Sequence, residues 1–194
     1  MFMTKLLIAS LVLVAAAPLF AGDIHGKVTA KSPRDSANVV VYVDAIAGKT
    51  FAAPAEHAKM DQKNMAFIPH VLPVLKGTTV DFHNSDAVLH NVFSPDACAD
   101  RVNLGTWGQG ESKSFTFKKP CFAVLLCKVH AEMEGYVAVL PTPYHAVTAS
   151  DGSYVIKDVP DGTYNVKVWH SKLKAGMKSV TVKGPTVTDF ALAK

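Results

Sequence analysis

The sequence from residue 122 to residue 140 reads FAVLLCKVHAEMEGYVAVL and contains two short apolar runs on either side of a polar loop. Both runs have the length of a buried β-strand, whereas a helix of ordinary size needs a longer periodic pattern. Cys127 ends the first run, and His130 and Met133 follow at intervals of three residues in the loop. The segment therefore predicts two consecutive β-strands, with a thiol, an imidazole and a thioether gathered where the first strand ends.

Similar runs cover the rest of the chain after residue 22. Segments rich in Val, Thr, Phe and Tyr alternate with turn residues, and no helical periodicity of useful length is present. We therefore expect an all-β protein. The segment 47–63 looks like a long irregular connection, with room for one helical turn at 54–58. Strands are expected at residues 24–29, 39–44, 64–68, 70–75, 78–83, 90–94, 112–118, 122–127, 136–140, 153–157, 163–170 and 178–182, and a last short one at 187–192.

The composition indicates packed apolar cores. The chain has 194 residues, of which 49% are hydrophobic, so we expect one or two domains and exclude intrinsic disorder. The formal net charge is only +4, from 20 basic and 16 acidic side chains that are spread along the chain. A nucleic-acid surface needs a concentrated basic patch, so we expect no nucleic-acid partner.

The N-terminal segment 1–21 differs from everything after it. Lys5 supplies a positive start, an apolar run covers residues 6–17, and Ala21 is a small residue suited to cleavage. This pattern is typical of a secretory signal peptide, and we place the cut after Ala21. A retained anchor helix is the alternative, although the run is short and no basic flank follows it. Cleavage would leave a periplasmic or otherwise exported protein with no membrane span.

A second imidazole precedes the Cys127 loop at His90, which opens a strand of its own. Two His, one Cys and a weakly bound Met are the ligands of a blue-copper site. Zinc prefers four tetrahedral ligands that do not include a thioether, so the Met argues against zinc. The four side chains could also be ordinary core residues, because Cys and Met are commonly buried.

These residues resemble the cupredoxin family. The C-x-x-H-x-x-M loop is as short as that of amicyanin. The run MAFIP at 65–69, followed by VLKGTTVDF at 74–82, is similar to the segment that leads to the first His ligand of the family. The resemblance covers roughly residues 60–140. It implies a Greek-key β-sandwich that binds copper.

The resemblance implies specific roles for five residues. His90, Cys127, His130 and Met133 would be the ligands of one copper ion that alternates between Cu(I) and Cu(II), and Asn91 would tie the two ligand loops together. The implied function is that of a type 1 copper protein that carries single electrons. Its partners would be redox proteins such as a cytochrome c or a periplasmic dehydrogenase.

The remaining two cysteines and the residues on either side of Cys127 help to distinguish a simple copper site from other kinds of copper protein. With Cys127 on copper, Cys98 and Cys121 are left to form a disulfide in an oxidising compartment. The alternatives are two unpaired thiols, or a disulfide of Cys127 with another cysteine that would abolish the copper site. A dinuclear copper centre would need a second Cys within the ligand loop, and multicopper oxidases flank their Cys with His, whereas Leu126 and Lys128 stand here. We therefore expect no enzyme. A copper chaperone or storage protein and a purely structural β-sandwich module are the other functions considered.

The C-terminal part carries two tight-turn signals, DGSYVI at 151–156 and VPDGTY at 159–164. Asp-Gly pairs supply the positive φ that tight turns require. These motifs resemble the carboxypeptidase-regulatory-like, transthyretin-type β-sandwich, whose first two strands would match Gly26-Lys27-Val28 and the run at 38–43.

The resemblance places the first two strands of that sandwich before the copper-binding segment. We therefore expect a discontinuous second sandwich, formed by residues 22–46 plus 141–194, with the cupredoxin domain inserted at 47–140. The alternative is a cupredoxin domain at 22–140 followed by a separate domain at 141–194.

Overall fold

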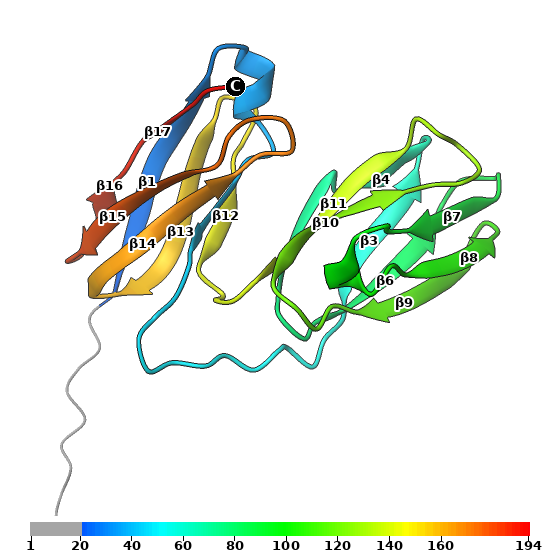
Figure 1. Ribbon diagram of the computed structural model, residues 1–194, viewed down its shortest axis with the longest axis horizontal. Coiled ribbons are helices and arrows are strands. Elements are labelled where there is room, and N and C mark those ends of the chain that lie inside the picture. Colours follow the sequence, from blue (N-terminus) through cyan, green and yellow to red (C-terminus); the bar gives the residue numbers. More distant parts are fainter. Residues whose placement is uncertain (1–20) are drawn as a thin grey trace, which may run out of the picture.

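The computed structural model describes residues 21–194, which form two β-sandwiches side by side (Figure 1). The all-β prediction is confirmed, because the helical parts of this range are two short 3-10 turns, η1 (Pro33–Ser36) and η2 (Ala97–Ala99). None of the described helices is long and apolar enough to cross a membrane. The expected signal peptide lies outside the described residues except for Ala21, which begins the first strand.

The first sandwich, drawn in cyan to yellow-green in Figure 1, is built from strands that lie between residues 58 and 140. Its two sheets enclose a core that contains Met60, Phe82, Phe117 and Leu125. One sheet has the order β5 (Val71–Leu75), β11 (Glu134–Leu140), β10 (Cys121–Leu126), β7 (His90–Phe93) and β8 (Asn103–Trp107). The other has the order β4 (Ala66–Ile68), β3 (Ala58–Lys63), β6 (Thr79–Asn84) and β9 (Ser112–Thr116).

The second sandwich joins the two ends of the described chain. It encloses a separate core that contains Ile24, Val41, Ile156 and Val166. One sheet has the order β12 (His145–Val147), β2 (Val40–Val43), β14 (Gly162–Trp169) and β15 (Gly176–Val182). In the other, β1 (Ala21–Ala30) pairs with β13 (Ser153–Pro160), β16 (Thr186–Val187) and β17 (Phe190–Leu192).

A third apolar cluster joins the two sandwiches. The rings of Phe122 in β10 and Trp169 in β14 stack with centroids 4.5 Å apart and planes 2° from parallel. Tyr136 of β11 meets the same Trp edge-on at 5.1 Å. The unbroken apolar runs of β2 and β11 have their explanation here, because each of these strands is buried on both faces.

Three strands escaped the sequence prediction, and one connection was interpreted wrongly. The segment 47–63 was expected to be irregular, yet its last part is strand β3, and the dipeptide after it turns the chain back into β4. Asn64 and Met65 both adopt left-handed φ angles of 54° and 59°, as in a two-residue hairpin turn, so the strand expected at 64–68 starts two residues later. Residues 54–58 form no helical turn. Strands β8 and β12 were also missed.

Candidate metal centre

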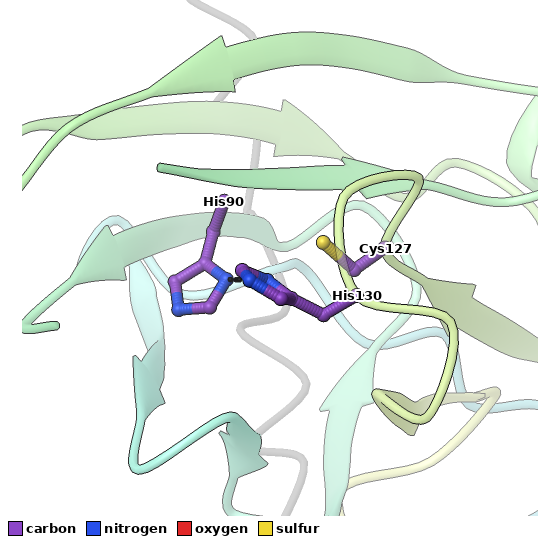
Figure 2. A group of neighbouring side chains, drawn as sticks. All are labelled: His90, Cys127 and His130. Carbon is purple, nitrogen blue, oxygen red and sulfur yellow. Dashed lines mark hydrogen bonds between the residues drawn. The ribbon is translucent and has the colours of Figure 1, made fainter. Parts of the chain in front are cut away.

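Three donor side chains meet at one end of the first sandwich. Cys127 directly follows β10, His130 lies in the loop that leads to β11, and His90 opens β7, so the site joins two distant segments of the chain. One potential ligand atom from each residue lies within 4.8 Å of the other two. Figure 2 shows the two imidazole rings side by side, at a steep angle to each other and close to the sulfur, and their Nδ1 atoms are 3.0 Å apart.

Asp86 holds one edge of the His90 ring. Its Oδ2 lies 2.8 Å from Nε2 of the fully buried ring, at hydrogen-bond distance from that nitrogen. When the N–H of a neutral His90 ring points at Asp86, Nδ1 has a free lone pair, and it lies 3.0 Å from Nδ1 of His130. The orientation is that of a metal-ligating His backed by a carboxylate.

Asp86 is held in turn by the β3–β4 hairpin. Main-chain amides of Asn64 and Met65 donate to its two carboxylate oxygens at 2.8 and 3.0 Å. The Met65 amide, with further help from His90 and Asn64, holds the pKa of Asp86 below its ordinary value. Sequence reasoning missed this residue. A carboxylate four residues before the His was visible, but the hairpin that orients it was predicted incorrectly.

Asn91 connects the two segments that carry the donors. Its main-chain N–H donates to Sγ of Cys127 at 3.3 Å, and its side-chain Oδ1 accepts from the amide of Lys128 at 3.3 Å. The other end of the side chain donates to Oδ1 of Asn103 and to the carbonyl of Gly105. These bonds connect the segment that carries His90 with the loop that carries Cys127 and His130.

Met133 is buried in the core of the first sandwich. Its side chain is 1% exposed and belongs to the same core cluster as Cys127, and its amide donates to the carbonyl of His130 at 3.1 Å. His90 is fully buried, whereas the His130 ring is only half-buried. His90, Cys127 and Met133 are therefore buried, and His130 is the residue of this set that reaches solvent.

The other candidate residues lie away from this cluster. His70 is exposed and packs edge-on against Tyr136, and His83 bonds to Ser112 on the outer face of its sheet. Cys98 and Cys121 form the expected disulfide, which ties the segment after β7 to the start of β10. Cys127 is the free cysteine of the described residues.

The donor set fits a copper ion. Metals of the first transition row bind nitrogen and sulfur at about 2.0–2.3 Å, so donors around one ion stand about 3–4 Å apart. The three residues already approach that spacing, and Nδ1 of His90 is available as an unprotonated nitrogen. A thiolate and imidazoles with a nearby thioether select copper over hard cations.

One family model matches the part of the chain that carries the three donors. Residues 54–140 match the model of the copper binding proteins of the plastocyanin/azurin family. No curated protein matches the sequence.

Solved structures provide three further likenesses. A copper-containing nitrite reductase from Thermus scotoductus SA-01 is 26% identical, with a TM-score of 0.43, over 52% of this chain and 25% of that chain. A purple cupredoxin from Nitrosopumilus maritimus is 24% identical over 42% of this chain and 98% of that one, with a TM-score of 0.39. A reduced amicyanin variant is 23% identical over 51% and 97%, with a TM-score of 0.41. The segment that carries His90, Cys127 and His130 is thus similar in sequence to the copper-binding plastocyanin/azurin family.

Proposed function

We propose that this protein is a periplasmic type 1 copper protein that carries single electrons between redox partners and is not itself an enzyme. The main support for this proposal is that His90, Cys127 and His130 converge within a segment that matches a copper-binding family. Met133, buried in the same core, would be the fourth ligand. One bound copper ion would supply a centre that gains and loses a single electron.

The protein groups around the donors limit rearrangement. Asp86 keeps the His90 ring in one orientation, and the Asn91 amide holds the Cys127 sulfur. Both contacts are made by groups of the protein itself, so the fold would help to hold the donors in place around a metal. Metal binding would replace the hydrogen bond that the Nδ1 atoms of His90 and His130 share at 3.0 Å.

The surface around His130 would be the docking face for a redox partner. Val129, beside it in the loop, is 47% exposed, and Val88 and Leu89, just before His90, are 46% and 57% exposed. Exposed apolar side chains of this kind would contribute contact area for a partner. We propose a cytochrome c or a periplasmic dehydrogenase as the class of partner.

We also propose the domain limits. Residues 47–140 would form the copper domain, inserted in a second domain made of residues 22–46 and 141–194. Strand pairing supports this division, because β1 and β2 pair with strands that follow residue 144. A transthyretin-type origin of the second domain is supported by Gly152, whose φ of 82° completes the Asp-Gly turn.

Copper reconstitution tests the function. The protein should bind one equivalent of Cu(II) and develop an intense visible absorption that a mild reductant bleaches and reoxidation restores. His130→Ala should abolish the visible band, whereas the matched control His83→Ala, on the outer face of the sheet, should keep it. Copper bound without the visible band would favour a chaperone or storage protein. Failure to bind copper would favour a structural module.

A further inference from the structure

A fully buried amide lies in the core of the first sandwich, at Gln62 of β3. The side chain is 0% exposed, although it is polar and its strand neighbours on the same inner face are apolar. Removing an amide from water costs several kcal/mol unless hydrogen bonds replace the water. Its Nε2 donates to the main-chain carbonyl of Asn91 at 3.3 Å, while Oε1 has no protein partner among residues 21–194. The Gln62 amide therefore makes one hydrogen bond, and the desolvation of its Oε1 is not offset by any protein partner among these residues.

The carbonyl that Gln62 contacts belongs to an irregular part of β7. The register with β8 shifts between Asn91 and Phe93, as at a β-bulge. At this position the N–H of Asn91 donates to Sγ of Cys127, and its C=O accepts from Gln62. The main chain of one residue is therefore held on one side by the candidate ligand sulfur and on the other by the buried amide.

We propose that Gln62 is a positioning residue for the Cys127 sulfur, acting through the main chain of Asn91. The inference rests on the proposed copper function, and it assigns the buried amide a role in setting the hydrogen bond to the thiolate. Hydrogen bonds to this sulfur tune the reduction potential of blue-copper sites. An N–H dipole stabilises electron density on sulfur, so a weaker bond should favour Cu(II) over Cu(I).

The substitution Gln62→Met isolates this role, because methionine has nearly the same length and volume but no donor. In the metal-free protein, the Asn91 amide should exchange with solvent about fivefold faster, as expected for the loss of one hydrogen bond. In the copper-loaded protein, the preference for Cu(I) over Cu(II) should fall by about threefold or more. Gln62→Asn, which withdraws the donor without removing the amide, should act in the same direction and provides a second variant if Gln62→Met does not fold.

The matched control is Met60→Leu, two residues earlier on the same buried face of β3. It should reduce stability without changing Asn91 exchange or the potential. If the Gln62 variants lose stability but keep the wild-type Asn91 exchange and potential, Gln62 serves packing only and the inference is overturned. If wild-type protein develops no visible copper band, the proposed function fails, whereas the exchange experiment still tests the link from Gln62 to Asn91.

Discussion

The carboxylate of Asp86 offers the most direct test of how the fold prepares the metal centre. The substitution Asp86→Ala removes the acceptor of His90 Nε2–H and of the two hairpin amides. The hairpin amides lie on an exposed turn and can bond to water, but the His90 ring is fully buried. An unpartnered donor in that position costs about 1–3 kcal/mol. We expect a loss of that size in the free energy of unfolding of the metal-free protein.

Copper affinity should fall together with stability. Without Asp86, the His90 ring loses the carboxylate that holds Nε2 and so directs Nδ1 toward the other donors. Loss of a carboxylate behind a ligating His typically weakens metal binding about 10–100-fold. Competition with a chromophoric chelator at constant pH measures this factor, and urea unfolding of the metal-free protein measures the stability.

Asp81→Ala is the matched control. Asp81 lies in β6, accepts bonds from Ser114 and His57 on the outer face of the sheet, and has no contact with His90. It should change stability by about 1 kcal/mol or less and leave copper affinity at the wild-type value. If Asp86→Ala also binds copper with wild-type affinity, the carboxylate does not orient His90 for the metal, and our account of the site is wrong.

Three further perturbations test the rest of the structure. Trp169→Ala should lower the free energy of unfolding, measured with urea, by about 2–3 kcal/mol, because the ring stacks on Phe122. This is somewhat less than the loss of a completely buried ring costs. A loss below about 0.5 kcal/mol would show that the packing between the sandwiches contributes little to stability. Cys98→Ser should cost about 3 kcal/mol in the same assay yet keep the visible copper band, because the disulfide lies outside the donor cluster. Burial raises the pKa of Tyr154, and burial with a hydrogen bond to Glu134 raises that of Tyr136 to about 12. Their contribution to stability should therefore persist below about pH 10 and decline above it. An ultraviolet titration should show both phenols ionising at a higher pH than an ordinary tyrosine, whose pKa is about 10.

The sequence was most informative where chemistry and strand periodicity coincide. The apolar run before Cys127 and the three-residue spacing that follows predicted a strand and a donor-bearing loop, and the structure has both. The hairpin at 64–65 gave no such signal, because neither of its residues is a glycine although both adopt left-handed angles. Since that hairpin orients Asp86, one missed turn concealed both strand β3 and a residue of the site.

The contacts between the two sandwiches could not be predicted from the sequence either. The unbroken apolar run at 39–43 is compatible with any strand that is covered on both faces, and it does not indicate what covers the second face. In the structure, Val40 and Tyr42 of this run face the first sandwich, whereas Val41 and Val43 face the second core. Long-range packing alone decides between these partners.

Strand β10 contacts the second sandwich with one face and leads into the candidate metal centre at its end, so the second sandwich packs against this strand without covering the centre. Its side chains alternate, so Ala123 and Leu125 point into the core below the candidate site, while Phe122 and Val124 point toward the second sandwich. Cys127 continues the inward series where the strand ends. The interface thus uses one face of the strand and the site uses its end. The second sandwich fixes the orientation of the donor-bearing strand, and the half-buried His130 ring stays accessible to a partner.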